Sequence, residues 1–352
     1  MRKINVGDIT LKKLSQEREI SLLFREKSAI ANCADLLGAD AVELPGVKNL
    51  REDTIIYKTI AQNVQNATLA IPVGFNKEDV LSTWECIKDA KKPRLQIELP
   101  VSTIQMEYTY HVKQAKMLEK IAELIKEAKN YCEDVEFLAL DATRADVDFL
   151  IATAKEAQSN GAGIITICDN AGVSTPKEVS DLVLKVKEAV SIPVYVQVSD
   201  RINMGVASAY AAISKGADGI KCAMAGKDIL LTGEFCDAIS VCGSQIDAMV
   251  TLDTTKIHSK IDDMLSNINH ESYESDNTVS EKKKILLDSD STMADILMLF
   301  LNCGIRRSEL VGLNLSDVYE DRIRVLGKGN KERFVYFGSA CRKAIDAYLP
   351  IR

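Results

Sequence analysis

The sequence predicts an α/β protein in which the first 250 residues form a (β/α)8 barrel and a small, truncated α+β domain follows. Short apolar runs alternate with longer stretches that carry apolar residues at three- and four-residue spacing, a pattern typical of βαβ units and a parallel sheet. Eight such units precede about residue 245, which is the number that closes a barrel of this type. After about residue 250 the alternation stops.

The eight predicted strands lie in short apolar runs that begin at the N-terminus. They are residues 4–10, 41–46, 67–74, 94–102, 135–143, 163–172, 193–200 and 219–226. Two of the predicted helices between them, residues 146–161 and 177–190, have clear helical periodicity. A doubly wound open sheet is the alternative, although no GxGxxG motif opens its first unit.

The remainder of the chain predicts a linker and a second domain. Residues 251–289 are predicted to be a helix and then a linker, because HESYESDNTVSEKKK is polar and lacks apolar periodicity. Residues 290–352 predict two helices joined by a glycine turn, a hairpin at 322–337 around GKGNK, and a closing helix.

Charge and cysteine content narrow the classes of function. The net charge of −7 gives no sign of a nucleic-acid partner for the whole chain, but from Asn302 onward ten Lys or Arg residues face six Asp or Glu residues. The nine cysteines show no CxxC spacing, which favours reduced thiols and a cytoplasmic protein. No apolar run is long enough for a membrane helix.

Polar residues at the ends of the predicted strands are the candidates for chemistry. Asp8 and Asp169 are carboxylates that could hold a divalent metal, which polarises a carbonyl group. Alternatively, they cap helices or accept hydrogen bonds from loop amides. Lys221, on the last strand, could form a Schiff base, or it could point into solvent or pair with a carboxylate.

The segments GDITLKK, ICDNAGVSTPKEV and VQVSDRINMGVASAYAAISKGADGIKCAMAG carry a resemblance that extends over residues 1–260. They resemble the isopropylmalate and homocitrate synthase family, which is related to hydroxymethylglutaryl-CoA lyase and to pyruvate carboxyltransferases. The resemblance implies a TIM barrel, often dimeric, that uses a divalent metal to condense the enolate of an acyl-CoA with a 2-oxo acid.

This sequence departs from that family at its functional positions. By the resemblance, the family's metal ligands fall on Asp8, Gln197, Ser199 and Gly233, so Asp8 is the one carboxylate retained. The family's arginine and aspartate after the first strand fall on Lys12 and Lys13. We therefore expect no Mg²⁺, Mn²⁺ or Zn²⁺ and interpret the barrel as a pseudoenzyme that keeps room for a 2-oxo acid or acyl-CoA-like ligand. The alternative is an active carbon–carbon bond-forming or -cleaving enzyme that does bind such a metal.

The stretch LNCGIRRSELVGLNLSDVYEDRIRVLGKGNKERFVYF resembles the catalytic domain of tyrosine recombinases, the phage integrases, over residues 290–352. The resemblance implies that Arg306 binds a DNA phosphate and that Lys328 reaches the DNA from the hairpin. The family's HxxR segment and tyrosine nucleophile do not follow in this sequence. We expect weak DNA binding without strand cleavage, and a DNA integration or recombination protein is the alternative.

Overall fold

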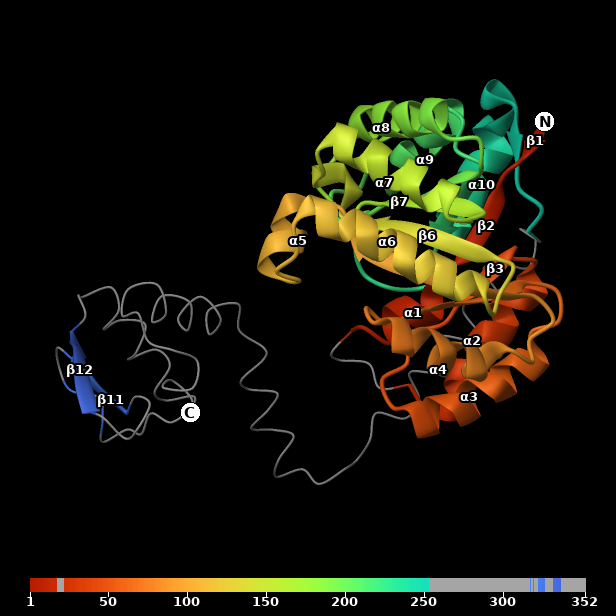
Figure 1. The fold of residues 1–352 in the computed structure, drawn as a ribbon. Coiled ribbons are helices and arrows are strands. Elements are labelled where there is room, and N and C mark those ends of the chain that lie inside the picture. The colour runs from red at the N-terminus through yellow and green to blue at the C-terminus, as the bar shows by residue number, and fades with distance from the viewer. Residues whose placement is uncertain (18–21, 253–316, 318, 320–321, 327–331, 337–352) are drawn as a thin grey trace. The chain divides into compact units, whose positions relative to one another are not determined.

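Eight parallel strands close into a barrel in the computed structural model of the chain (Figure 1). The structure describes residues 1–17, 22–252, 317, 319, 322–326 and 332–336. Contacts divide the chain into two units, Met1–His270 and Glu271–Arg352, and the barrel strands all belong to the first. The predicted (β/α)8 barrel is confirmed, because an open sheet would leave its two edge strands unpaired.

Every predicted strand segment overlaps one barrel strand, and the hydrogen-bonded parts are mostly shorter than the apolar runs. The strands pair in sequence order, and the last returns to the first through pairs such as Val6 with Ile220. The barrel strands are β2 (Asn5–Asp8), β3 (Ala41–Glu43), β4 (Thr68–Pro72), β5 (Pro93–Pro100), β6 (Val135–Leu140), β7 (Ile164–Cys168), β8 (Val194–Gln197) and β9 (Gly219–Cys222).

Helices connect successive strands and surround the barrel. The two predicted helices at 146–161 and 177–190 are confirmed as α7 and α8, with bounds that differ by one or two residues. The described helices are α1 (Thr10–Leu14), α2 (Phe24–Leu37), α3 (Leu50–Asn63), α4 (Lys77–Ile87), α5 (Thr103–Tyr108), α6 (Gln114–Lys129), α7 (Val147–Ser159), α8 (Pro176–Ala189), α9 (Gly205–Ser214) and α10 (Thr232–Cys242), with short 3-10 turns at Ala142–Arg144 and Gly243–Ile246.

Side-chain caps fix where several of these helices begin. The Asp146 carboxylate accepts a hydrogen bond of 2.9 Å from the backbone N–H of Phe149 at the start of α7. Before α8, the Thr175 hydroxyl accepts from the backbone N–H of Glu178, whose carboxylate accepts from the backbone N–H of Thr175 in return, and Pro176 takes the first helical position. These caps supply partners for amides that have none within the helix.

The two faces of the barrel strands differ in chemistry. The outer face is apolar, and residues such as Val42, Ile97 and Ile165 are fully buried in the core that lies beneath the helices. The alternate, inner positions carry charged and polar residues that include Glu43, Gln96, Glu136, Thr166 and Lys221. The hydrophobic core is therefore a shell around the barrel, whereas the axis of the barrel is polar.

A two-stranded pair lies beside the barrel, where β1 (Arg2–Lys3) runs parallel to β10 (Ala248–Met249). It joins the N-terminus to the last described part of the first unit. In the second unit, β11 (Arg322–Leu326) and β12 (Glu332–Tyr336) form an antiparallel pair, which confirms the predicted hairpin strands. The predicted helices on either side of this pair lie outside the described residues.

No helix in the described ranges of the chain is long and apolar enough to cross a membrane.

Candidate functional site

The carboxyl ends of the barrel strands bring most of the candidate residues to one mouth. Asp8, Glu43 and Gln197 are the last residues of β2, β3 and β8, and Asp169 follows the last residue of β7. Parallel strands in a closed barrel point all of these ends the same way. The short helix α1 begins directly after β2 and carries Lys12 into the mouth.

Asp8 is held inside the turn between β2 and α1. Its carboxylate accepts hydrogen bonds from the Thr10 hydroxyl, at 2.7 Å, and from the Thr10 backbone N–H, at 3.2 Å. The Thr10 hydroxyl in turn accepts from the backbone N–H of Met224, 2.7 Å away. Burial raises the pKa of Asp8 to about 7, and the nearby Glu43 carboxylate adds to this rise. Asp8 thus links the first turn to the loop after β9.

Two of the other three mouth candidates, Asp169 and Ser199, also have local side-chain partners. The Asp169 carboxylate accepts from the Thr143 hydroxyl at 2.7 Å and from the Gly172 backbone N–H at 3.0 Å. The Ser199 hydroxyl donates to the Asp228 carbonyl at 3.0 Å, and Gln197 is buried. The side chains of Asp8, Asp169, Gln197 and Ser199 make no hydrogen bond to one another, although the backbone N–H of Asp169 donates to the Gln197 carbonyl at 2.9 Å. The described part of the chain holds no group of three or more His, Cys, Asp or Glu placed to hold a metal.

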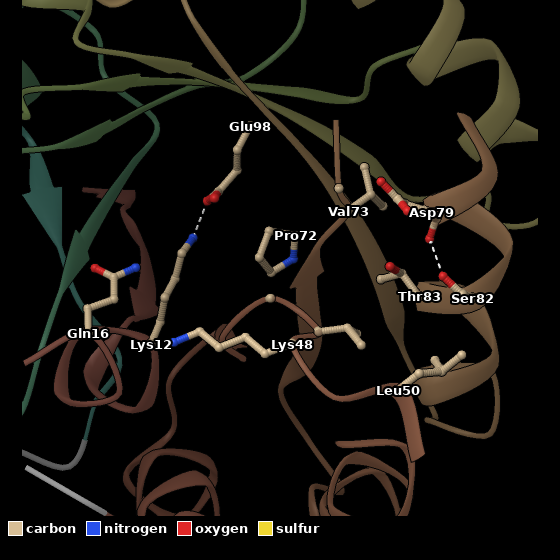
Figure 2. A pocket seen from close by; sticks show the side chains of 13 residues that line it. Lys12, Gln16, Lys48, Leu50, Pro72, Val73, Asp79, Ser82, Thr83 and Glu98 are labelled. Carbon is tan, nitrogen blue, oxygen red and sulfur yellow. Dashed lines mark hydrogen bonds and ion pairs between the residues drawn. The ribbon is translucent and has the colours of Figure 1, made fainter. Parts of the chain in front are cut away.

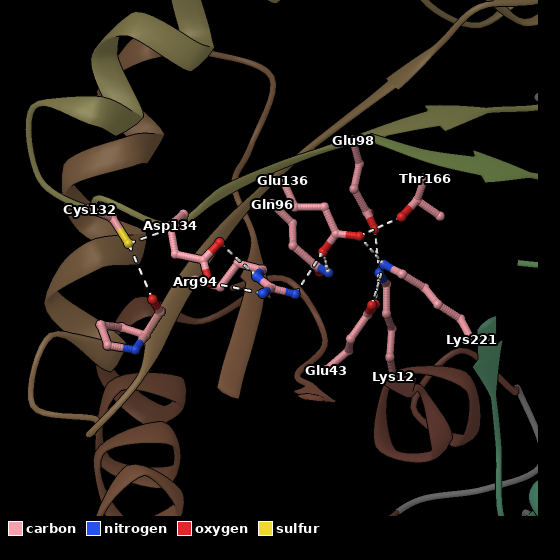
Figure 3. Close-up of polar contacts among 11 residues, drawn as sticks. Lys12, Glu43, Arg94, Gln96, Glu98, Cys132, Asp134, Glu136, Thr166 and Lys221 are labelled. Carbon is pink, nitrogen blue, oxygen red and sulfur yellow. Dashed lines mark hydrogen bonds and ion pairs between the residues drawn. The ribbon is translucent and has the colours of Figure 1, made fainter. Parts of the chain in front are cut away.

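A row of alternating charges fills the interior of the barrel and reaches the mouth (Figure 3). We call it the interior charge row, and in order its members are Asp134, Arg94, Glu136, Lys221, Glu43, Lys12 and Glu98. Lys221 Nζ lies 2.7 Å from Glu136 Oε1 and also contacts Glu43. Because β3 and β9 flank β2 and β6 lies on the opposite side of the closed barrel, these contacts lie inside it.

Lys12 is the cation of this row that stands at the mouth. Its Nζ lies 2.8 Å from Glu43 Oε2 and also contacts Glu98 Oε1. Burial alone lowers the pKa of Lys12, but the carboxylates of Glu43 and Glu98 outweigh that effect and raise it overall. Burial likewise opposes ionisation of Glu43, but Lys12 and Lys221 hold the pKa of Glu43 well below its ordinary value. Lys12 is therefore a permanent cation.

The sequence pattern identified only part of this row. Lys221 is 1% exposed and pairs with two carboxylates, which agrees with the paired alternative and not with a solvent-facing lysine. The sequence analysis did not identify Glu136 and Arg94. The available signal was a charged residue within each apolar strand, Glu136 in VEFLAL and Arg94 in PRLQIELP. Such a residue either faces solvent or has a buried partner, and the pattern alone does not tell which.

A cavity of about 460 Å³ opens beside the row at the mouth (Figure 2). It is lined by residues from α1 and the turn that follows it, from the loops after β3 and β4, from the ends of β4 and β5, and from α3 and α4. Lys12 and Glu98 lie on one side, and Lys48 lies on the wall formed by the loop after β3. None of Asp8, Asp169, Gln197 and Ser199 lines this cavity. The cavity therefore has two lysine side chains in its lining, of which Lys12 is paired with carboxylates.

Comparison with known protein families establishes the family of the barrel. The model of the HMGL-like family matches residues 3–236. The chain belongs to the HMGL-like family. The resemblance seen in the sequence is thereby confirmed for the barrel. A second family model, that of the phage integrase family, matches residues 267–352.

Relatives within the HMGL-like family include two named 2-isopropylmalate synthase. The one from Bacillus velezensis is 34% identical over 230 residues, and the one from Clostridium kluyveri is 31% identical over 229 residues. Each match covers 64% of this chain and only 44% or 45% of the relative, so this chain spans less than half of their length. The crystal structure of the HMG-CoA lyase from Brucella melitensis matches with a TM-score of 0.65 and 12% identity, over 77% of this chain and all of that one. This last likeness shows the fold alone.

The two residues assigned by resemblance to the phage integrases, Arg306 and Lys328, lie outside the described residues. The described strands β11 and β12 flank the GKGNK stretch in the sequence. On this pair, the guanidinium of Arg322 lies 5.5 Å from the Tyr319 ring centre and 5.3 Å from that of Phe334. Arg324 pairs with Asp317 at 2.6 Å.

Proposed function

We propose that the barrel binds a small 2-oxo acid at its mouth and does so without the divalent metal that the resemblance implies. The observation that carries this proposal is the cavity of about 460 Å³, in which the ammonium groups of Lys12 and Lys48 meet a space of small-molecule size. Ammonium groups suit the carboxylate of such a ligand. A ligand carboxylate that reaches Lys12 takes the place of Glu98, the end member of the interior charge row.

The residues at the implied metal site do not fit a divalent ion. Mg²⁺ and Mn²⁺ prefer several carboxylate or other oxygen ligands, and Zn²⁺ prefers histidine and cysteine. Here the positions hold one carboxylate, an amide, a hydroxyl and Gly233, which has no side chain. The Asp8 carboxylate and the Ser199 hydroxyl already have protein partners, and burial disfavours the ionised form of Asp8. The proposed function therefore includes no metal-dependent step. The barrel is interpreted as a pseudoenzyme in the sense that it lacks the metal-dependent condensation.

Calorimetric titration with 2-oxoisovalerate, in the presence of EDTA, tests this proposal. We expect saturable binding that Lys48→Met weakens about tenfold, which corresponds to about 1.4 kcal/mol, through loss of one ammonium group. Lys185→Met is the matched control, because Lys185 is an exposed lysine that lines a different cavity. Binding that requires Mn²⁺ and is lost in Asp8→Ala, or Mn²⁺-dependent release of CoA from acetyl-CoA with a 2-oxo acid, would contradict the proposal and favour the active synthase.

We also propose, as a second function, weak duplex DNA binding by the C-terminal unit. The match of residues 267–352 to the phage integrase family supports it, together with the antiparallel strands β11 and β12 around GKGNK. A basic hairpin of this kind binds phosphates through charge, with little dependence on sequence.

A further inference from the structure

Two carboxylates hold the ammonium group of Lys12, and they differ in exposure. The Glu43 side chain is 1% exposed, whereas that of Glu98 is 20% exposed. Lys12 and Glu98 both line the cavity of about 460 Å³, and Glu43 does not. Figure 2 shows the Glu98 side chain reaching from its strand to the Lys12 ammonium group at the side of the cavity. Glu98 is therefore the partner of Lys12 that a ligand in the cavity can displace.

A displaced Glu98 carboxylate has no second cation to pair with. Among the described residues, Lys12 is the one cation within salt-bridge distance of Glu98. The interior charge row holds four carboxylates and three cations, so it already has an excess of negative charge. The carboxylate of a 2-oxo acid adds to this excess, and a third carboxylate then stands beside Lys12. Like charges held this close favour the protonated form of one of them.

Other ionisable groups from several elements surround Glu98. They are Lys13 of α1, Glu43 at the end of β3, Tyr110 after α5, Cys168 at the end of β7 and Lys48 of the cavity lining. Burial raises the pKa of Cys168 to about 12, and burial together with the charge of Glu98 raises the pKa of Tyr110. Both groups are therefore neutral near pH 7, and the two lysines of the row keep Glu43 ionised.

The two remaining lysines near Glu98 act differently. Lys48 is exposed, so solvent weakens its effect on the carboxylates at the mouth. Lys13 is half-buried, and burial and the charge of Lys12 lower its pKa. Lys13 is thus the alternative group for proton uptake, which an experiment must distinguish from Glu98.

We propose that Glu98 competes with the ligand for Lys12 and that binding of a 2-oxo acid at the mouth is coupled to the uptake of one proton by the Glu98 carboxylate. The ligand carboxylate takes over the contact with the Lys12 ammonium group, and solvent supplies the proton to Glu98. The neutral carboxylic acid that results can donate a hydrogen bond to an oxygen of the ligand. No bond of the ligand is made or broken. This inference rests on the proposed function, because it requires a 2-oxo acid at Lys12.

Coupling to a proton makes ligand binding depend on pH. By linkage, a proton taken up on binding strengthens binding as the pH falls, by up to about tenfold per pH unit for one proton. If Glu98 instead moved into solvent as an anion, binding would be independent of pH in the same range.

Calorimetric titration of the full chain with 2-oxoisovalerate, in the presence of EDTA, measures this uptake directly. Titrations at one pH in buffers of different ionisation enthalpy are compared, because the buffer must release each proton that the complex takes up. We expect the observed enthalpy to rise with the ionisation enthalpy of the buffer, with a slope above zero and no greater than about one proton per ligand.

Glu98→Gln removes both the competing charge and the site of protonation. We expect the slope to fall to zero and binding at pH 8 to tighten about tenfold relative to the parent, with a smaller gain at pH 6. Glu85→Gln is the matched control, because Glu85 also pairs with a lysine, Lys88 at the end of α4, but does not line the cavity. The control should keep the slope and the affinity of the parent.

Infrared difference spectroscopy of the unsubstituted chain provides a second readout. With the glutamate carboxyl groups isotopically labelled, ligand binding should replace a carboxylate band with the C=O band of a carboxylic acid, which protonation of Lys13 does not produce. The isotope shift separates this band from the carbonyl group of the ligand. This readout needs no substitution, so it decides the question even if Glu98→Gln fails to fold.

The possible failures are distinguishable. Binding without proton uptake overturns this inference and leaves the proposed function in place, whereas absence of binding overturns both. Uptake that persists in Glu98→Gln, or a spectrum without the acid band, assigns the proton to another group such as Lys13 and also overturns the inference. Weaker binding by Glu98→Gln would likewise contradict it, because Glu98 would then hold the ligand instead of competing with it.

Discussion

Asp8 has partners suited to a structural carboxyl group in a turn. It accepts two hydrogen bonds from Thr10 and is 3% exposed. Because burial raises its pKa to about 7 from the ordinary 3.8, the folded protein binds this proton more tightly than the unfolded chain does. The contribution of Asp8 to stability is therefore most favourable below about pH 4 and declines as the pH rises to about 7.

The direction of this pH dependence predicts the effect of Asp8→Asn on stability. The amide oxygen can accept from Thr10 and carries no charge, so the variant avoids the cost of a buried carboxylate. One pKa unit corresponds to about 1.4 kcal/mol, and we expect the variant to be more stable than the parent by roughly 2–4 kcal/mol at pH 8 and by less at pH 5. Urea unfolding at both pH values measures this difference.

Asp169→Asn is the control for Asp8→Asn, because Asp169 also accepts local hydrogen bonds at the mouth. We expect no stabilisation from this control at pH 8. If Asp8→Asn destabilised the protein equally at pH 5 and pH 8, the carboxylate would be needed in its charged form and the argument from burial would be wrong.

At the scale of elements, the loop after β7 is shaped by Gly172. This glycine has a φ of +64°, a conformation that residues with a side chain rarely adopt, and a Cβ placed there would lie 2.5 Å from the Ser199 hydroxyl oxygen. Its backbone N–H also donates to Asp169. Gly172 therefore lets the loops after β7 and β8 approach each other closely at the mouth.

We expect Gly172→Ala to lower the free energy of unfolding by about 1–3 kcal/mol through backbone strain and displacement of Ser199. Gly163→Ala is the matched control, because its φ is not positive and the nearest atom to an added Cβ, the Val135 carbonyl oxygen, is 3.8 Å away. Chemical denaturation of both variants provides the comparison. Equal effects of the two substitutions would show that the approach of the two loops does not constrain Gly172.

The sequence was sufficient to predict the strands and their order, because alternating apolar positions and intervening helical periods are local features. It was not sufficient for the interior. Glu136 and Lys221 lie on β6 and β9, and their contact exists only once the barrel has closed. The fate of Asp169 was left open between a metal and loop amides, and its contacts with Thr143 and Gly172 are those of the loop interpretation. Absence of a bound metal stays a prediction.

At the scale of the whole molecule, two families are joined in one chain. The HMGL-like match ends at residue 236, and the phage integrase match begins at residue 267. The contact units divide at His270, whereas the sequence analysis placed a linker at 251–289. Residues from Asn302 onward are basic in balance while the whole chain has a charge of −7, so charge separates the two parts as well.

The basic charge balance of the C-terminal part leads to a prediction about DNA binding. We expect the full chain to bind a labelled duplex at low salt, with an affinity that falls steeply as salt rises. Lys328→Ala should weaken binding for all sequences alike and reduce the salt slope by about one, as for loss of one phosphate contact. Fluorescence anisotropy across a salt series measures both. Lys177→Ala, an exposed lysine of α8, is the control, and a lack of binding at the lowest salt would rule out the DNA function.

The interior charge row also limits how this barrel can diverge. Each inner member has an oppositely charged neighbour on both sides, so replacing one of them by an apolar residue takes one partner from each neighbour and leaves an unbalanced buried charge, at a cost of several kcal/mol. Replacing neighbours together removes that cost. During evolution, the charged residues of the row can therefore be replaced together, but each single substitution on the way gives an unstable protein. We expect descendants of this protein to retain the whole row.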